Sequence, residues 1–225
     1  MADEPFRKNP GAEDIFDRIR KEPHKSWVNY ILIAVNIAVF LYAEATGGST
    51  DVSHMLDLGA SYAPLIQAGE YYRLFTSMFL HFGLVHLLNN MILLFFIGDY
   101  VERYLGKVCY LIMYLSSGLF SGWFSWRHDL ATGSDSVSAG ASGAIFGVIG
   151  SLVVLVILHR GKLEDLTIQR VVLMAVFSLI VGFQSPGVDA YAHLGGLIGG
   201  IAVTLVLSPL FRRNHKKFSG NRTEK

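Results

Sequence analysis

The sequence predicts an all-α membrane protein that folds as a bundle of six transmembrane helices. Apolar residues make up 52% of its 225 residues and Asp, Glu, Lys and Arg only 16%, and the mean hydropathy is +0.40. A soluble domain usually carries about 25% charged residues, so too few charges are present here to cover a water-exposed surface. Six uncharged, mostly apolar stretches supply the spans, and with their flanks they approach the roughly 20 residues that cross a bilayer.

Charge and cysteine content exclude several other classes of protein. Nineteen basic and eighteen acidic residues leave a net charge of +1, which is too little for non-specific binding of nucleic acid. Cys109 is the single cysteine, so a disulfide-stapled secreted module and Cys-rich zinc or iron–sulfur sites are excluded. We expect no cofactor, no metal and no nucleic-acid partner; the expected partners are the lipid bilayer and proteins within it.

The elements follow one another without a soluble domain between them. Residues 1–27 mix six Lys/Arg with six Asp/Glu and are interpreted as a cytoplasmic tail. The predicted spans cover residues 28–43, 84–98, 108–126, 142–158, 171–188 and 190–211, which gives a membrane domain over 28–211 and a basic cytoplasmic tail over 212–225. The segment from about 46 to 80 is too apolar for a solvated loop and is expected to lie in the membrane interface.

The distribution of basic residues predicts the orientation of the bundle. Lys and Arg in short loops are retained on the cytoplasmic side. With the N-terminus inside, seventeen of the nineteen basic residues fall on that side, and only Arg73 and Arg127 fall outside. We therefore expect both termini in the cytoplasm. The compact core, without a visible soluble domain, favours a plasma (cell inner) membrane over an organelle membrane.

Polar residues cluster where lipid would disfavour them. His86 and Asn90 lie four residues apart on the second span, Ser142 opens the fourth span, and His193 lies near the start of the sixth. Polar side chains in a membrane usually face a protein interior or a water-filled cavity. Because the second, fourth and sixth spans all begin on the outer side, these four residues should meet in the outer part of the membrane.

Small residues should let the fourth and sixth spans approach closely. The spans carry Gly143 and Gly147, and Gly196 and Gly200, at spacings typical of packed membrane helices. A close approach would permit a Ser142–His193 hydrogen bond, as nucleophilic catalysis requires. From the residues alone, a serine nucleophile, a transporter or ion pathway, and a structural or partner-binding bundle all stay open. A metalloprotease motif is rejected because His81 and His86 are five residues apart without an intervening Glu.

Two motifs carry a resemblance to the rhomboid family of intramembrane serine proteases. The run Gly140-Ala141-Ser142-Gly143 is similar to that family's nucleophile motif, and Ala192-His193-Leu194-Gly195-Gly196 is similar to its histidine motif. The run from His81 to Asn90 resembles the signature of the second helix. Further matches are Tyr72-Arg73 in the interfacial segment and Gly98, Glu102 and Gly106 in a G-x-x-x-E-x-x-x-G pattern.

The resemblance implies a rhomboid-like six-helix bundle and a Ser142–His193 dyad without a third acidic residue. It also implies an oxyanion held by the Ser142 backbone N–H, His86 and Asn90. Two positions depart from the family pattern. Phe146 replaces a Tyr that packs on the catalytic imidazole, so stacking should survive without the hydroxyl, and Tyr104 stands where an Arg is often found.

The implied function is an endopeptidase that cuts membrane-anchored, single-span proteins within or next to their membrane segment, with the active site toward the outer leaflet. The alternatives are an inactive rhomboid-like protein that binds membrane helices and, less favoured, a small transporter. Asp189 lies four residues before His193 but in the preceding turn, so it is left out of the predicted site.

Overall fold

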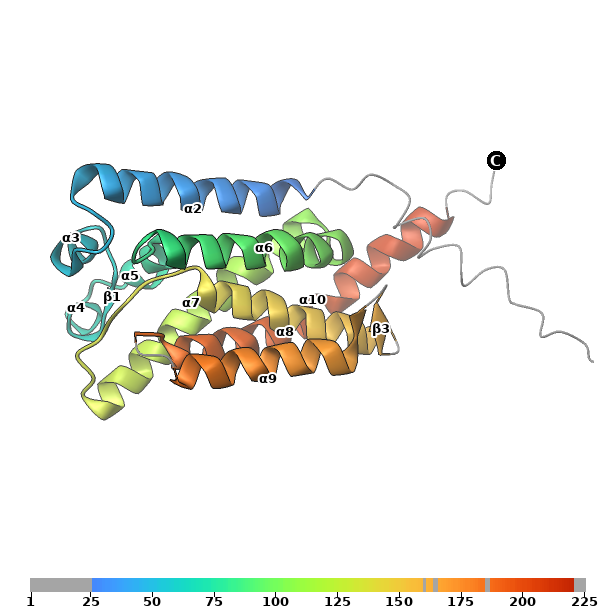
Figure 1. Ribbon diagram of the computed structural model, residues 1–225. Coiled ribbons are helices and arrows are strands. Elements are labelled where there is room, and N and C mark those ends of the chain that lie inside the picture. Colours follow the sequence, from blue (N-terminus) through green and yellow to red (C-terminus); the bar gives the residue numbers. More distant parts are fainter. Residues whose placement is uncertain (1–25, 160, 164–165, 185–186, 221–225) are drawn as a thin grey trace, which may run out of the picture.

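The computed structural model describes residues 26–159, 161–163, 166–184 and 187–220, and its main elements are long helices (Figure 1). The predicted spans correspond to α2 (Trp27–Thr46), α6 (Leu84–Leu105), α7 (Lys107–Thr132), α8 (Ser142–Leu158), α9 (Ile168–Gln184) and α10 (Ala190–Gly220). The fifth span, predicted over 171–188, is wrong at its end, because α9 ends at Gln184 and residues 187–188 are not helical. Within the described ranges, four helical segments are long and apolar enough to cross a membrane: α2, α6, α7 and residues Ala190–Leu210 of α10. Helices α8 and α9 are apolar but have only 17 residues each. The predicted helical membrane fold is confirmed, and the number of spans stays a prediction.

Short elements gather at one end of the bundle, between α2 and α6 (Figure 1). They are α3 (Val52–Asp57), β1 (Ser61–Tyr62), α4 (Ala63–Gln67), α5 (Arg73–Thr76) and the 3-10 helix η1 (Ser77–Phe79). We call this the α3–α5 end. The loop before α8 contributes β2 (Val137–Ser138), which pairs antiparallel with β1. A second pair, β3 (Lys162–Leu163) and β4 (Leu166–Thr167), connects α8 to α9 at the opposite end.

Helix α6 is longer than the sequence predicts, because its charged residues have partners. The expected span ends at residue 98, but the helix continues through Asp99, Glu102 and Arg103 to Leu105. Asp99 and Arg103 form an ion pair one turn apart. The Glu102 carboxylate accepts hydrogen bonds from the backbone N–H of Val28 at 3.3 Å and of Asn29 at 2.7 Å. Glu102 therefore satisfies free amides at the start of α2 and is fully buried there.

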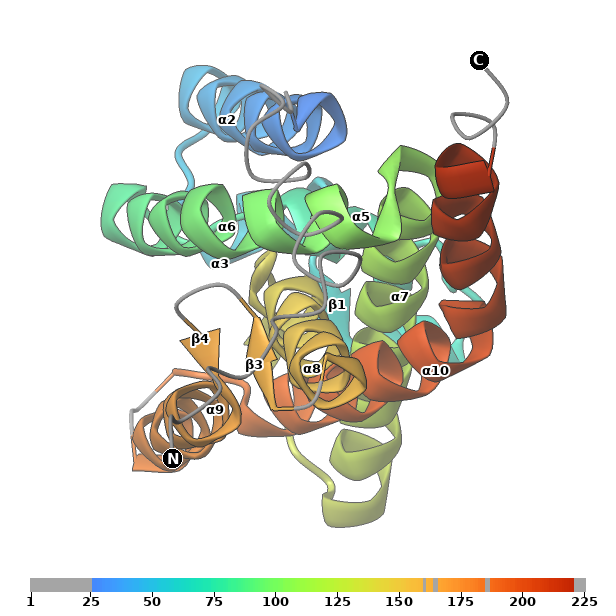
Figure 2. The same ribbon diagram turned by 90° about the vertical axis from the view of Figure 1, so that its right-hand side faces the viewer.

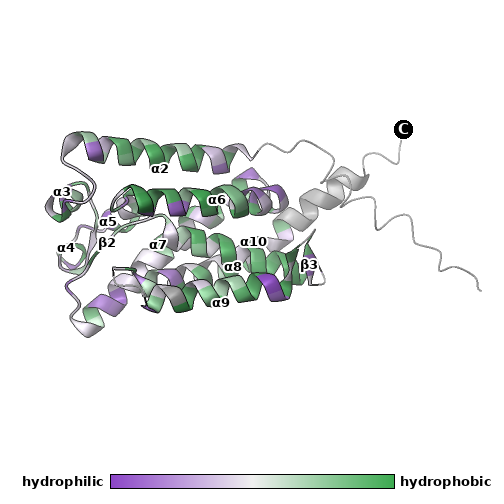
Figure 3. Ribbon diagram, viewed as in Figure 1, coloured by the Kyte–Doolittle hydropathy of each residue, from purple (hydrophilic) through white to green (hydrophobic). Residues whose placement is uncertain are grey.

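Helix α8 is the centre of the bundle. Figure 2 shows it enclosed by α6, α7, α9 and α10, all of which contact it. Most of its residues from Gly143 to Val156 are buried. The surrounding helices expose large apolar side chains instead, for example Phe96 on α6, Phe177 on α9 and Val206 on α10. Green, the colour of hydrophobic residues, dominates the middle of the bundle, and purple appears mainly near the helix ends (Figure 3). An apolar outer surface of this extent is suited to lipid.

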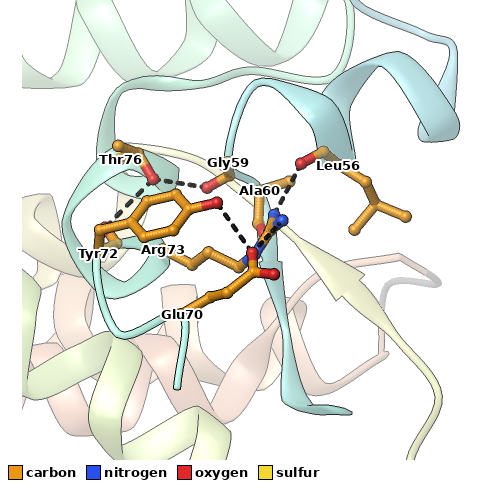
Figure 4. A network of polar contacts seen from close by, with 7 residues as sticks. All are labelled: Leu56, Gly59, Ala60, Glu70, Tyr72, Arg73 and Thr76. Atoms are coloured by element: carbon orange, nitrogen blue, oxygen red, sulfur yellow. Dashed lines mark hydrogen bonds and ion pairs between the residues drawn. The ribbon is translucent and has the colours of Figure 1, made fainter. Parts of the chain in front are cut away.

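Arg73 holds the segment between α2 and α6 in its fold (Figure 4). Its side chain is buried, and Nη1 donates to the carbonyl oxygens of Leu56 at 2.7 Å and Ala60 at 3.0 Å. Its Nε donates to the Glu70 carboxylate at 2.7 Å, and the Tyr72 hydroxyl donates to the same oxygen at 2.8 Å. These hydrogen bonds, first from Tyr72 and then from Arg73, lower the pKa of Glu70. The Tyr72-Arg73 motif thus stabilises the fold of this segment.

Candidate active site

The structure brings Ser142 and His193 together from positions 51 residues apart. Ser142 is the first residue of α8 and His193 lies in the first turn of α10. Their side chains are joined by a hydrogen bond of 2.9 Å between Ser142 Oγ and His193 Nε2. The imidazole is only 8% exposed. A hydroxyl and an imidazole in this arrangement can act as nucleophile and general base.

Glycines permit the helix contacts that this hydrogen bond requires. A Cβ on Gly196 would lie 2.9 Å from the carbonyl carbon of Gly143, and one on Gly200 would lie 2.6 Å from that of Gly147. On the other side of α8, a Cβ on Gly143 would lie 2.8 Å from Ser121 Cβ of α7. Real Cβ atoms do not approach carbon atoms so closely. The four glycines predicted to pack helices, Gly143, Gly147, Gly196 and Gly200, all lie at these contacts.

Phe146 stacks on the imidazole of His193. The ring centroids are 4.2 Å apart and the planes are inclined by 14°. The stack fixes the plane of the imidazole without a hydroxyl from this position. His193 Nδ1 is buried, and no residue in the described part of the chain accepts a hydrogen bond from it. The arrangement therefore contains a Ser–His pair without an acidic residue bound to the histidine.

His86 and Asn90 lie beside this pair but do not bond to it. The His86 ring packs against Gly140, because a Cβ on Gly140 would lie 2.9 Å from His86 Cε1. Asn90 is buried, and its amide donates to the His86 carbonyl at 3.1 Å. Within the described ranges, no hydrogen bond joins either side chain to Ser142. Hydrogen bonds used in catalysis are often formed only once substrate is bound, so this geometry leaves the predicted role of both residues untested.

His81 is a neighbour of the site to which the sequence analysis assigns no role of its own. It precedes α6, is 1% exposed, and its Nε2 accepts the backbone N–H of Ala141 at 3.3 Å. Its ring meets that of His86 edge to face, with centroids 5.1 Å apart. Burial, and then the neighbouring His86, lower the pKa of His81 to about 3. The ring therefore stays neutral and holds the residue before Ser142 in place. Its position at the head of the His81–Asn90 motif was the available signal.

The loop before Ser142 is more ordered than its polar composition suggests. Ser138 pairs with Ser61 in the β1–β2 ladder, and the Gly140 N–H donates to the Ser77 carbonyl at 2.9 Å. The segment held by Arg73 thereby supports the start of α8. The backbone N–H groups of the first turn of α8 receive no side-chain cap, and such free groups stabilise negative charge.

A small, open cavity with a volume of about 40 Å³ adjoins Ser142. Its wall combines the loop before α8 with α7 and the segment between α2 and α6. It is lined by small and apolar residues together with a single carboxylate, including Ser138, Gly140, Gly118, Gly122, Met78, Leu74 and Asp189. Small residues in the wall leave an opening next to the nucleophile.

Metal-ligating residues do not gather in the described part of the chain. No group of three or more His, Cys, Asp or Glu side chains is close enough there to hold an ion. His81 and His86 form a pair, but both rings are engaged in the packing described above. The chemistry these residues offer is nucleophilic attack with general-base assistance.

Comparison with known proteins shows the family to which the chain belongs. Residues 68–210 match the family model described as the Rhomboid domain. Rhomboid protease AarA of Providencia stuartii is 32% identical over 206 residues, which cover 79% of this chain and 72% of AarA. Rhomboid protease GluP of Bacillus subtilis (strain 168) is 34% identical over 183 residues, which cover 81% of this chain but only 35% of GluP, so the chain spans about a third of that relative's length. The family model matches more than half of the chain. Together with these relatives, it shows that the chain belongs to the rhomboid family.

Proposed function

We propose that the protein is an intramembrane serine endopeptidase that uses Ser142 as nucleophile and His193 as general base. The 2.9 Å hydrogen bond between Ser142 Oγ and His193 Nε2, inside a bundle with an apolar surface, is the observation that carries the proposal. Two relatives named rhomboid protease, GluP and AarA, support it. The rival function, binding membrane helices without cutting them, would not need Ser142 and His193 to be hydrogen-bonded.

The reaction proceeds by acyl transfer. His193 Nε2 takes the proton of Ser142 as Oγ attacks a peptide carbonyl, and the same nitrogen then protonates the leaving amine. The oxyanion is stabilised by the Ser142 N–H at the uncapped start of α8, with His86 and Asn90 as additional donors. Water admitted through the cavity next to Ser142 hydrolyses the acyl-enzyme. No cofactor takes part.

We place the α3–α5 end of the bundle on the outer side of a plasma membrane, with six spans and both termini in the cytoplasm. The charge distribution along the sequence supports this orientation, because seventeen of the nineteen basic residues fall in segments predicted to face the cytoplasm. Residues 28–211 form the membrane domain, with the tails 1–27 and 212–225 in the cytoplasm. Cysteines introduced at Ser53 and Ser134 should react with an impermeant maleimide added outside, and a cysteine at Ser219 should not. The reverse pattern would contradict the orientation.

Substrates are single-span membrane proteins whose helix unwinds easily near the outer surface. Each carbonyl of a membrane helix is engaged in a hydrogen bond within the helix, so the protease must receive an unwound strand before Ser142 can attack. Gly or Pro in the outer half of the substrate span lowers the free energy needed to unwind its helix. A small residue before the cut fits the small residues around Ser142.

The test uses purified protein in liposomes with a single-span reporter. We expect cleavage in the outer part of the span, located by the mass of the products, and none by Ser142→Ala. Reporter variants in which the outer Gly and Pro residues become Leu, or the residue before the cut becomes Phe, should be cut more slowly. Absence of any cleavage by the wild-type protein, while it still binds the reporter, would favour the inactive rival.

A further inference from the structure

Asp189 is the one carboxylate that lines the cavity next to Ser142, and it sits one helical turn before His193. We propose that Asp189 is a positioning residue that sets the place of the His193 imidazole through the backbone of α10. The inference rests on the proposed function, because it assigns Asp189 a role in the reaction of Ser142 and His193. It differs from a third member of a catalytic triad, which would bind the imidazole itself.

Asp189 caps the start of α10. It directly precedes Ala190, the first residue of the helix. Its carboxylate Oδ1 accepts the backbone N–H of Ala192 at 2.8 Å, and its own carbonyl accepts the N–H of His193 at 3.2 Å. An N-cap side chain that accepts from the third helical residue satisfies one of the free amides at a helix start. Asp189 therefore accepts two hydrogen bonds from the turn that carries His193, one with its carboxylate and one with its backbone carbonyl.

The second carboxylate oxygen fastens this turn to α7. Asp189 Oδ2 accepts the hydroxyl of Ser125 at 2.5 Å, and the neighbouring Ser121 hydroxyl donates to the Ala192 carbonyl at 2.6 Å. Ser121 and Ser125 are buried, whereas Asp189 and Ala192 lie at the wall of the cavity next to Ser142. Ser125 and Ser121, one turn apart on α7, thus bind the two residues that flank this turn. Ser125 binds Asp189, and Ser121 binds Ala192.

The carboxylate acts through the backbone because it does not reach the ring. Both of its oxygens have other partners, and within the described ranges Nδ1 of His193 has none. The imidazole is placed by the turn that carries it and by the Phe146 stack. A displacement of about 1 Å in a catalytic group can cost about 10²-fold in rate, so a loosened turn should slow the chemical step and leave substrate binding unchanged.

Variants at position 189 separate capping from charge. Asp189→Ala removes both carboxylate bonds, and we expect kcat to fall by about 10- to 100-fold with KM changed by less than about twofold. Asp189→Asn keeps a good N-cap and an amide that can bond to Ser125, so kcat should stay within about threefold of wild type. Ser125→Ala removes only the link to α7 and should give an intermediate loss of kcat.

Asp51 offers a matched control. It caps α3 in the same way, accepting the N–H of His54 at 2.8 Å, but α3 carries no residue of the site. Asp51→Ala should leave kcat within about twofold of wild type. A kcat loss in Asp189→Asn as large as in Asp189→Ala, an unchanged kcat in Asp189→Ala, or a rise in KM alone would each overturn the proposal.

Hydrogen exchange tests the same idea without activity. In the Ser142→Ala background, Asp189→Ala should speed exchange of the amides at 190–193 by about fivefold or more, whereas Asp189→Asn should not. Equal exchange in the two variants would refute the capping role, even if Asp189→Ala proved hard to purify in active form. Residual cleavage by Ser142→Ala itself would instead refute the proposed function and leave the exchange result standing.

Discussion

Replacing Gly196 with Ala perturbs the contact between α8 and α10 directly beside the proposed dyad. The new Cβ would lie 2.9 Å from the carbonyl carbon of Gly143 and 3.3 Å from its Cα. Carbon atoms pack best at about 3.5–4.0 Å. The Gly143 carbonyl oxygen lies nearer still to the new Cβ. Because these obstacles are backbone atoms, no side-chain rotation can relieve the contact, and α10 must move away from α8 by about 1 Å or more.

That movement should reach the reacting atoms. Gly143 adjoins Ser142, and Gly196 lies one turn after His193, so the 2.9 Å hydrogen bond between Ser142 Oγ and His193 Nε2 should lengthen with the helix separation. Protein hydrogen bonds of this kind extend to only about 3.2 Å. We expect kcat to fall by about 10²-fold. Overpacking costs about 1–3 kcal/mol, and replacing a helical glycine returns up to about 1 kcal/mol, so the protein should stay folded with a lower melting temperature.

The assay is cleavage of the single-span reporter together with thermal unfolding in detergent. Gly200→Ala is the matched comparison, because its Cβ would lie 2.6 Å from the carbonyl carbon of Gly147, one turn farther from His193. It should lower the melting temperature to a similar degree but reduce kcat less. Gly122→Ala, whose Cβ would make an ordinary 3.4 Å contact with the Leu74 carbonyl, should not lower the melting temperature and should raise it slightly, because alanine favours a helix over glycine. Full kcat in Gly196→Ala, or a greater loss in Gly200→Ala, would refute the reasoning.

Three further outcomes follow from the site. Ser142→Ala, His193→Ala and the double variant should be about equally inactive, since each residue needs the other; a double variant far slower than either single would argue against one catalytic unit. Alanine at His86 or Asn90 should lower kcat by up to about 10²- to 10³-fold with less effect on KM, whereas an unchanged kcat in both would make them helix contacts only. Because burial lowers the pKa of His81 to about 3 against about 6.5 in an unfolded chain, only the unfolded state takes up a proton as pH falls below about 6.5. The free energy of unfolding should therefore decrease as pH falls below about 6.5. His81→Gln should show a flatter dependence of melting temperature on pH, and an equal slope in both proteins would contradict this.

The helices could be predicted well wherever an apolar stretch is bounded by residues that end a helix, such as glycine or charged residues. Helix α8 begins at Ser142 after Gly140 and ends at Leu158, as the uncharged stretch predicts. The end of α6 was missed because a hydropathy pattern counts Asp99, Glu102 and Arg103 as charges and cannot see that Glu102 binds the start of α2. A hydrogen-bond partner about 70 residues away cannot be recognised from the sequence around Glu102.

The same distinction applies to the site. The expectation that Ser142 and His193 share one side of the bundle follows from counting spans, and the structure places them in contact. Three supporting contacts could not be predicted: the β1–β2 pairing, the bond from Ala141 to His81, and the link from Asp189 to Ser125. Each joins segments about 60 or more residues apart through groups common in loops, so neither periodicity nor spacing indicates them. In the structure the Asp189 carboxylate bonds to Ser125 and Ala192, and its capping of α10 could not be predicted from the sequence.

Covalent labelling tests the central claim most directly. The purified protein in liposomes is treated with a mechanism-based serine-hydrolase inhibitor, and the modified peptide is identified by mass spectrometry. The account predicts a single adduct on Ser142 that is abolished in Ser142→Ala and strongly reduced in His193→Ala, because the hydroxyl is activated by the imidazole 2.9 Å away. Labelling of a different serine, or labelling of Ser142 at an unchanged rate in His193→Ala, would contradict it.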